Sequence, residues 1–404
     1  MKIRVPIITI ALLYFTSCSK DSDSIDSYLG IDIPKNSIDS YLDSKMTSYN
    51  IPGLSIAIIN NGEVVYHKTK GYADIEHQKP VTNNTIFEGA SISKSVFAYF
   101  VMKFVEEGKL DLDKPLYQYM EYPDIAYDER YKAITARMVL SHRTGFPNWR
   151  EDDDDDVLKL NFDPGTNYSY SGEGYQYLAL VLKHIEHTDW NGLEARFQEK
   201  VAKPLGMAHT VFIENEYTNA YKAAAYVPEG KVDVENNYWS KKDKGIFSAP
   251  SSIHSEAIDF SKWMIAVMNK EGLTEESYKE LFKPHSIVEE RDYYDIYYTL
   301  GFSTPKIPFT NIYLHGGNNI GFTSWFALDT HKNWGYVLFT NSEYGERLGE
   351  ELLLYLAAGP DKTKLYWPIG GILVIIICSF SYFVIQIRKR IKKAKAKHYK
   401  TLNE

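Results

Sequence analysis

Ser91 and Lys94 stand three positions apart where an apolar run begins, and together they could perform nucleophilic chemistry. On a helix, positions i and i+3 share a face, so the hydroxyl and the ammonium group would be neighbours. A serine becomes a nucleophile when a base removes its proton, and a lysine can be that base once desolvation lowers its pKa. The apolar run at 96–102 predicts a buried helix, which disfavours the alternative of a solvated helix face.

Two later segments carry groups that could complete such a site. Residues 164–172 contain Tyr170, whose phenol can carry a proton, and residues 314–322 contain His315 followed by two glycines. Glycines at a strand edge allow a substrate backbone to approach closely. Each residue also has a plain structural interpretation, because the chain has 32 tyrosines and a strand histidine can be an ordinary core residue. Their order behind Ser91, rather than their types, favours catalysis.

The order of these three elements resembles the penicillin-recognising serine hydrolases, most closely the class C β-lactamases, the D-Ala-D-Ala carboxypeptidases and their esterase and amidase relatives. Stretches at 71–74, 139–147 and 204–207 resemble that group in the same order, so the resemblance covers residues 35–358. It implies an α/β fold of the β-lactamase/transpeptidase type, with an antiparallel sheet flanked by helices and a mostly helical subdomain. It also implies hydrolysis through an acyl-serine intermediate, without a cofactor or a metal ion.

The resemblance assigns catalytic roles to four side chains: Ser91, Lys94, Tyr170 and His315. Ser91 would be acylated, Lys94 would share its proton, and Tyr170 would act beside them as general base or acid. His315 would replace the lysine that the family more usually has on this strand, a replacement common among its esterase-like and peptidase-like members.

The oxyanion-binding groups that the resemblance implies are the backbone N–H groups of Ser91 and Asn318, with Gly316 and Gly317 at the same strand edge. The chain departs from the family at Gly172, because the usual Tyr-x-Asn is Tyr-Ser-Gly here. The missing side-chain amide contacts the acylamino group of β-lactams and peptides, so its loss should weaken their recognition by about 1–3 kcal/mol. The sequence therefore predicts acyl-serine chemistry and leaves β-lactam hydrolysis open.

Charge is distributed unevenly along the 404 residues, whose formal net charge is −8. The last 17 residues hold eight Lys or Arg against one Glu, and residues 1–18 add two basic side chains, so the segment 19–387 carries −17. So acidic a domain is a poor binder of nucleic acid or anionic lipid, and we expect no nucleic-acid partner. The length and the 44% of hydrophobic residues suffice for one large core or two closely packed subdomains.

The N-terminus has the pattern of an export signal. Two basic residues precede an apolar run at 5–15, which is too short for a membrane span and typical of a signal peptide over residues 1–18. The run ends in Phe-Thr-Ser-Cys, which resembles a bacterial lipobox and makes Cys18 a lipidation candidate. The alternative is an ordinary or uncleaved signal peptide with an incidental cysteine. Residues 19–34 would then form a linker.

The C-terminus has the pattern of a membrane anchor. Residues 366–387 are uncharged and mostly apolar, and at 1.5 Å per residue such a helix spans about 33 Å, which disfavours a buried core helix. The basic residues 388–404 follow at once, and the positive-inside rule places them in the cytoplasm. The hydrolase domain is then extracytoplasmic on a single-pass protein of the bacterial cell membrane. Cys378 lies in the span and Cys18 in the signal, so the domain has no disulfide to rely on.

Alternating apolar residues indicate where the domain's strands lie. Strands are expected at 54–59 and 64–67 around a turn, near Tyr313, at 323–328 and at 335–340. A helix at about 347–358 would close the domain, and the middle of the chain is expected to be mostly helical. Strands at both ends imply one antiparallel sheet that the two ends share, with a helical insertion that holds Tyr170.

Two further clusters have metal-like composition and simpler explanations. The acidic run 151–156 is interpreted as a solvated loop, with a weak calcium site as the alternative. His184, Glu186 and His187 share a helix without further ligands, which favours a chance spacing. No Gly-x-Ser-x-Gly elbow and no phosphate-binding loop occurs in the sequence.

The sequence as a whole predicts a membrane-anchored, extracytoplasmic serine hydrolase that acts on an ester or amide of a small molecule or peptide. The alternative is a penicillin- or peptidoglycan-binding sensor that acylates slowly. The tail of 17 residues disfavours a sensor, because it is too short for a folded output domain. A structural pseudoenzyme would be expected to lack one of Ser91, Lys94 and Tyr170, and none is lost.

Overall fold

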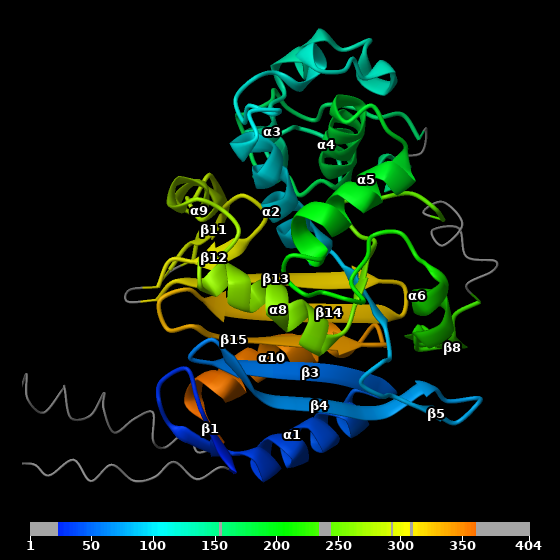
Figure 1. Ribbon diagram of the computed structural model, residues 1–404, viewed down its shortest axis with the longest axis vertical. Coiled ribbons are helices and arrows are strands. Elements are labelled where there is room, and N and C mark those ends of the chain that lie inside the picture. Colours follow the sequence, from blue (N-terminus) through cyan, green and yellow to red (C-terminus); the bar gives the residue numbers. More distant parts are fainter. Residues whose placement is uncertain (1–22, 153–155, 234–243, 292–293, 308–309, 361–404) are drawn as a thin grey trace, which may run out of the picture.

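The centre of the molecule is a nine-stranded antiparallel sheet (Figure 1), within the residues that the computed structural model describes: 23–152, 156–233, 244–291, 294–307 and 310–360. In order across the sheet, the strands are β10 (Ser286–Glu289), β11 (Ile296–Tyr298), β12 (Ser303–Pro305), β13 (Ile312–Asn319), β14 (Phe322–Asp329), β15 (Trp334–Thr340), β3 (Gly53–Asn60), β4 (Glu63–Asp74) and β5 (Lys79–Pro80). Every neighbouring pair runs antiparallel. The two ends of the domain share one sheet, as predicted, because β15 pairs with β3.

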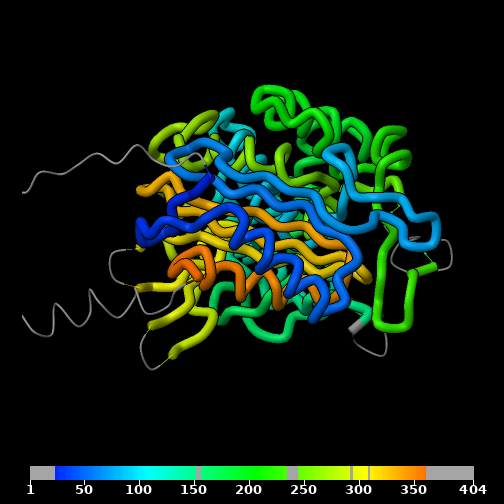
Figure 2. The backbone as a smooth tube through the Cα atoms, turned by 90° about the horizontal axis from the view of Figure 1, so that it is seen from below, coloured from blue at the N-terminus to red at the C-terminus, as the bar shows by residue number. Residues whose placement is uncertain are grey.

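Helices cover both faces of this sheet. Figure 2 shows α1 (Lys35–Ser48) and α10 (Gly345–Ala358) in front of the strands, and α2 (Ser93–Glu106) and α8 (Ala257–Met268) contribute to the core on the opposite face. The nucleophile candidate Ser91 lies just before α2, so the helix that carries Lys94 is fixed by the larger of the two cores.

The interior strand β3 contributes to both cores. Leu54, Ile56 and Ile58 belong to the core under α1 and α10, whereas Ala57 and Ile59 belong to the core on the other side. A strand that is buried on both faces needs apolar residues at nearly every position, which explains the continuous hydrophobic run in the sequence.

The elements predicted around this strand are confirmed. Asn60 pairs with Glu63 around a two-residue turn, in which Asn61 and Gly62 have φ angles of 53° and 79°. Positive φ at both positions is what the favoured hairpin turn requires. The later predicted strands correspond to β13, β14 and β15, and the predicted closing helix corresponds to α10.

A mostly helical lobe is inserted between the two parts of the sheet and lies at the top of Figure 1. Between β5 and β13, the structure further describes β6 (Phe87–Ala90), η1 (Leu116–Gln118), η2 (Pro123–Ile125), η3 (Glu129–Ala133), α3 (Ala136–Leu140), η4 (Arg150–Asp152), α4 (Gly172–Ile185), α5 (Trp190–Phe197), η5 (Gln198–Ala202), α6 (Glu216–Tyr221), β7 (Tyr226–Val227), β8 (Gly230–Lys231), β9 (Ile253–Ser255) and α9 (Glu275–Leu281). The Tyr170 loop precedes α4 in this lobe, where a helical insertion was expected.

The linker predicted for residues 19–34 is wrong from residue 23 onward. This segment forms β1 (Ser24–Asp26) and β2 (Asp32–Pro34), which pair with each other. Ile25 and Ile33 are buried in the core under α10, and the Tyr28 hydroxyl donates a hydrogen bond of 2.9 Å to Asp329 at the end of β14. The Asp- and Ser-rich composition conceals these few apolar anchors.

The predicted membrane elements lie outside the described residues. These are the signal peptide with Cys18, the span at 366–387 and the basic tail at 388–404. In the part of the chain that the structure does describe, no helix combines the length and the apolar character needed to cross a bilayer.

Candidate active site

Ser91 lies in the turn between β6 and α2. The turn includes Ala90, whose φ of 48° lies in the left-handed region that side chains other than glycine rarely adopt. Ser93 stabilises the turn, because its hydroxyl donates a hydrogen bond to the Ala90 carbonyl and accepts one from the Ile253 N–H at 2.9 Å. Ser91 therefore precedes the helix instead of opening it. Lys94 still comes within one turn, since its N–H donates to the Ser91 carbonyl at 3.1 Å.

The Lys94 amine is buried beside the Ser91 hydroxyl. Its Nζ lies 3.2 Å from Ser91 Oγ and 2.9 Å from the Pro250 carbonyl oxygen, and only 1% of the residue is exposed. It also lies 4.5 Å from the ring centre of Tyr170 and 5.7 Å from that of Tyr175. Among the described residues no carboxylate pairs with it, and burial lowers the pKa of Lys94 well below its ordinary value. Burial thus favours the neutral amine, which can accept the Ser91 proton.

Tyr170 brings a second proton-carrying group to the same serine. Its ring centre lies 4.5 Å from Lys94 Nζ, its phenol is near enough to the Ser91 side chain for that hydroxyl to lower the Tyr170 pKa, and the loop that carries it ends at Ser171, the N-cap of α4. Burial raises the pKa of Tyr170, although the Ser91 side chain partly offsets this. The phenol is therefore protonated at neutral pH. A protonated phenol beside the nucleophile can pass a proton on without carrying a charge in the resting enzyme.

The His315 imidazole is turned into the protein. Its Nδ1 lies 2.6 Å from the Gly316 carbonyl oxygen, so Nδ1 carries the proton, and Nε2 accepts the hydroxyl of Tyr298 at 2.9 Å. Burial, followed by the nearby Lys94, lowers the pKa of His315 to about 3, so the ring is neutral at pH 7. Its ring centre lies 6.2 Å from that of Tyr170. Both nitrogens are thus held by protein groups at the edge of the Ser91 site.

The end of β13 lies against the nucleophile turn. A Cβ atom at Gly317 would lie 2.4 Å from the Gly89 carbonyl oxygen and 2.9 Å from the Ser91 nitrogen, so only glycine allows this approach. The Ser324 hydroxyl of β14 donates to the same Gly89 carbonyl at 2.6 Å. Asn318, the next residue, is exposed at this edge. The arrangement brings the strand edge that was expected to bind an oxyanion next to the Ser91 N–H.

A partly buried carboxylate, Glu88, connects the two sides of this junction. The Asn319 side-chain amide at the end of β13 donates to Glu88 at 2.6 Å and to the Ser251 carbonyl at 3.3 Å. Glu88 stands on β6, three residues before Ser91, and also pairs with Lys222 at 2.7 Å. Lys222 lowers the pKa of Glu88 against the opposing effect of burial, so the carboxylate stays ionised and keeps its hold on Asn319.

Several site residues were not identified from the sequence. Tyr298 lies on β11, which belongs to a group of three-residue strands that has no clear period-2 pattern. Tyr175 lies on α4, and its hydroxyl donates to the Leu140 carbonyl at 3.0 Å. His142 lies in a stretch that resembles the family, yet only the structure reveals that its ring centre is 4.3 Å from that of Tyr170. The matching stretch itself was the signal that could have drawn attention to His142.

The departure at Gly172 has a structural counterpart. A Cβ atom there would lie 2.8 Å from the Trp149 ring and 3.0 Å from the Asn148 carbonyl oxygen, so the start of a side chain would meet an aromatic ring. The acidic run begins nearby, because Arg150 binds the Glu173 carboxylate through two nitrogens at 3.0 and 2.8 Å. This contact places residues 151 and 152 beside the first turn of α4, which starts two residues after Tyr170.

Clusters of possible metal ligands in the described part of the chain lie outside this site. Asp74, Glu76 and His77 come together, but Lys231 pairs with both carboxylates at 2.9 and 3.2 Å. A second group consists of His209, Glu256 and Asp259, of which Asp259 accepts two backbone N–H groups and pairs with Lys262. In the predicted chance cluster, Glu186 is bound by Lys109 at 2.6 Å and by Arg196 at 2.7 Å. Protein cations thus already bind carboxylates in all three groups.

A sheet with helices on both faces, a helical lobe and a serine in contact with a buried lysine define a serine hydrolase of the β-lactamase and penicillin-binding type. The chain belongs to the Beta-lactamase family, whose family model matches residues 38–359. It is similar to the protein flp of Staphylococcus aureus strain MW2, at 24% identity over 337 residues, which are 78% of this chain and 65% of flp. The chain thus spans just under two thirds of that relative's length.

Other relatives fit the same class. A putative penicillin-binding protein, PbpX of Bacillus subtilis strain 168, is 26% identical over 309 residues, covering 72% of this chain and 71% of PbpX. Among solved structures, the octameric penicillin-binding protein homologue from Pyrococcus abyssi superposes with a TM-score of 0.68 at 23% identity, over 80% of this chain and 76% of that one. The D-alanine carboxypeptidase AmpC from Burkholderia cenocepacia gives 0.64 at 19% identity, over 80% and 98%. At these identities the solved structures establish the fold alone.

Proposed function

We propose that the protein is a membrane-anchored, extracytoplasmic hydrolase that cleaves esters or uncharged amides through an acyl intermediate on Ser91. The observation that carries the proposal is the position of Ser91 Oγ, which lies 3.2 Å from the buried Lys94 amine, while that same amine lies 4.5 Å from the ring centre of Tyr170. A serine hydroxyl attacks a carbonyl carbon once a neighbouring group takes its proton, and Lys94 and Tyr170 are two groups here that can carry protons.

The mechanism follows from these contacts. Ser91 Oγ attacks the substrate carbonyl carbon and gives its proton to the neutral Lys94 amine, while the backbone N–H groups of Ser91 and Asn318 stabilise the developing oxyanion. Tyr170 delivers a proton to the leaving group and recovers one from Lys94, so the leaving group departs neutral and the acyl-serine remains. A water molecule then attacks the acyl carbon and gives up a proton through the same groups. Ser91 takes a proton back as the acid product leaves.

The substrate class is proposed from the charges around the site. The strand position that carries a lysine in many relatives holds His315, which is neutral because of its low pKa. A neutral residue offers no fixed cation to the carboxylate that β-lactams and D-Ala-terminated peptides share. At Gly172 the amide that would contact an acylamino group is absent, and Trp149 fills the adjacent space. Glu151, at the start of the acidic run, follows Arg150 beside the first turn of α4, and the charge of the run would repel anions further, although salt screens exposed charges beyond about 8 Å.

A second candidate, peptidoglycan peptides, is favoured by the names of two relatives, a putative penicillin-binding protein and a D-alanine carboxypeptidase. For this chain the two functions differ in a measurable way. A carboxypeptidase would release D-Ala from a D-Ala-D-Ala peptide with turnover. A penicillin-binding sensor would be acylated by penicillin once and release the product slowly.

The test combines labelling and turnover. Purified wild-type protein should react with a fluorophosphonate probe and hydrolyse a neutral short-chain ester faster than nitrocefin or a D-Ala-D-Ala peptide. Ser91→Ala should abolish both labelling and turnover. Ser95→Ala, which removes a buried hydroxyl bonded to the Gly301 carbonyl, is the matched control and should keep both. Undiminished turnover in Ser91→Ala would overturn the catalytic assignment, and an anionic β-lactam preferred over every neutral ester would overturn the substrate class.

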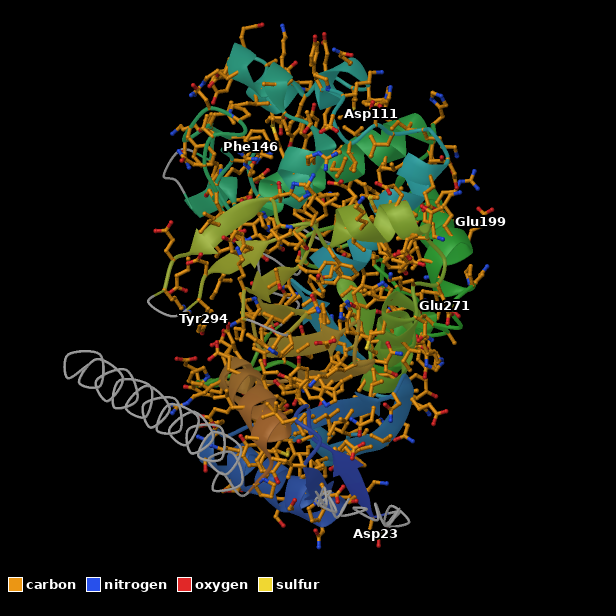
Figure 3. All side chains as sticks on the ribbon, turned by 90° about the vertical axis from the view of Figure 1, so that its left-hand side faces the viewer. Asp23, Asp111, Phe146, Glu199, Glu271 and Tyr294 are labelled. Carbon is orange, nitrogen blue, oxygen red and sulfur yellow. The ribbon has the colours of Figure 1, made fainter. Side chains whose placement is uncertain are left out.

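The membrane topology is supported by the position of the two ends of the domain. The Tyr28 and Leu29 N–H groups donate to the carbonyls of Leu356 and Ala357 at 2.9 and 3.3 Å, so the turn between β1 and β2 lies against the end of α10. Figure 3 shows Asp23 at the opposite end of the molecule from Asp111 and Phe146 in the helical lobe. A lipid on Cys18 and a span at 366–387 would thus leave the domain at the same end. Protease added to spheroplasts should remove the domain, whereas protection there and digestion in inverted vesicles would refute this topology.

A further inference from the structure

The loop that carries Tyr170 is hydrogen-bonded on both sides to one residue, His142. The Ser169 N–H donates to the His142 carbonyl at 2.9 Å, and the Ser171 N–H donates to the His142 Nδ1 atom at 3.0 Å. Between these two bonds, the imidazole lies against the Tyr170 ring, with 4.3 Å between the ring centres and 38° between the planes. His142 thus contacts the residue before Tyr170, the residue after it and its side chain.

The backbone of His142 is itself held in an uncommon conformation. It follows the end of α3, and its φ of 57° is in the left-handed region, which glycine or asparagine usually occupies at a helix end. Its N–H donates to the Val139 carbonyl at 3.1 Å, and the next N–H, of Arg143, donates to Met138 at 2.7 Å. A histidine at such a position needs a reason in its side chain, and the contact with the Tyr170 loop supplies one.

Only one form of the imidazole can make this contact. Nδ1 accepts a hydrogen bond, so Nε2 carries the proton, and the ring must be neutral. His142 is fully buried, and burial together with the nearby Lys94 and His315 lowers its pKa well below the ordinary value. Nε2 has no hydrogen-bond partner within the described residues, so no donor there favours the tautomer in which Nδ1 carries the proton. An imidazolium would instead direct an N–H group at the Ser171 N–H and would break the contact.

We propose that His142 is a positioning residue, which fixes the Tyr170 phenol at Ser91 by accepting the Ser171 N–H and by packing its ring against Tyr170. The inference rests on the proposed function, because it assigns His142 an effect on rate that passes through Tyr170. A residue with only a core-packing role would lower stability without a specific effect on the Tyr170 step.

The test uses two substitutions that both suit a positive φ. His142→Asn keeps an acceptor at the δ position, whereas His142→Gly removes both acceptor and ring. His142→Gly should lower kcat and the rate of fluorophosphonate labelling by about 10–10²-fold with KM changed less than about threefold, the scale expected for a misplaced catalytic group. His142→Asn should recover at least about tenfold of that loss, although the ring contact is missing in both variants. Thermal unfolding of each variant distinguishes a lower catalytic rate from a smaller fraction of folded protein.

A double-mutant cycle decides whether the effect passes through Tyr170. In a Tyr170→Phe background, His142→Gly should reduce the labelling rate by less than about threefold more, because the phenol that it positions is gone. Equal losses in the two backgrounds, or equal losses in His142→Asn and His142→Gly, would overturn the inference. If His142→Gly does not fold, His142→Gln, whose acceptor lies one atom too far, takes its place in the same comparison. If Tyr170→Phe alone leaves labelling unchanged, the proposed mechanism fails, whichever result His142 gives.

Discussion

One added methyl group at Gly317 should separate the oxyanion strand from the nucleophile. In Gly317→Ala the new Cβ atom would start 2.4 Å from the Gly89 carbonyl oxygen and 2.5 Å from Ser324 Oγ. Contacts below 3.0 Å are essentially absent for real Cβ atoms, so β13 and the Ser91 turn must move apart by about half an ångström or more. The first obstacle is a backbone carbonyl close to the nucleophile, which cannot rotate away as a flexible side chain could.

The magnitude has a stability part and a catalytic part. Overpacking of this kind costs about 1–3 kcal/mol, which corresponds to a Tm lower by about 2–10 °C in a domain of this size. Complete loss of one oxyanion donor costs about 10²–10³ in kcat, and a partial displacement of the donor should cost about 10–10². The loss should fall on kcat more than on KM, because the donors act most strongly on the charge that develops in the transition state.

The assay is kcat and KM for a neutral p-nitrophenyl ester, with Tm measured on the same samples. Gly335→Ala on β15 is the matched control. Its Cβ atom would also meet a backbone carbonyl oxygen, that of Ala327 at 2.8 Å, but on a strand that does not carry the proposed oxyanion site. The control should lower Tm comparably and leave kcat within about twofold. If Gly317→Ala keeps the kcat of the wild type while its Tm falls like that of the control, the proposed oxyanion strand is refuted.

Three further outcomes follow from the buried groups. Lys94→Met should lower the labelling rate by about 10²–10⁴ but raise Tm, because a buried amine without a carboxylate partner costs desolvation; a lower Tm would contradict this. Wild-type kcat/KM should fall on the acid side as Lys94 gains a proton. The free energy of unfolding should rise with pH between the lowered pKa of Lys94 in the folded protein and its unfolded value of about 10.5, because unfolding takes up a proton in that range. Lys94→Met should reduce this slope, which Tm measured against pH would show. His315 has a folded pKa of about 3 against 6.5 unfolded, so unfolding takes up a proton in that window and stability is lost as pH falls through it. His315→Gln should reduce this acid loss in denaturant titrations at pH 7 and pH 4.5, and an unchanged difference would show that His315 does not cause it.

The sequence predicts those parts of the fold that local patterns encode. The β3–β4 hairpin follows from a hydrophobic run and an Asn-Gly turn, and α10 follows from its helical periodicity. The three short strands β10, β11 and β12 have no such pattern and depend on pairing with each other and with β13. The packed hairpin of β1 and β2 was missed for a similar reason, because only its tertiary contacts distinguish it from a polar linker.

The site divides in the same way. Ser91, Lys94 and Tyr170 lie together as expected, since the first two are local neighbours and the third belongs to a recognisable segment. His315 was placed on the correct strand, but its inward orientation depends on the hydroxyl of Tyr298, which a sequence pattern does not provide. The contact of His142 with the Tyr170 loop joins residues 29 positions apart in the chain. Such contacts follow from packing between elements and could not be inferred from either segment alone.

The pairing of β15 with β3 also dictates when this chain can fold. Ile58 faces Tyr336 in this pairing, so two neighbouring strands of the sheet come from nearly opposite ends of the domain. A growing chain cannot form that pair until β15 has been made, and closing so long a loop slows folding. Until then β3 can pair only with β4, so it keeps one free edge and two apolar faces that are not fully covered, which makes the incomplete chain prone to aggregation. A nascent chain that ends before β15 would therefore lack the strand pair that joins the two ends of the domain, and we expect it to be unfolded and inactive.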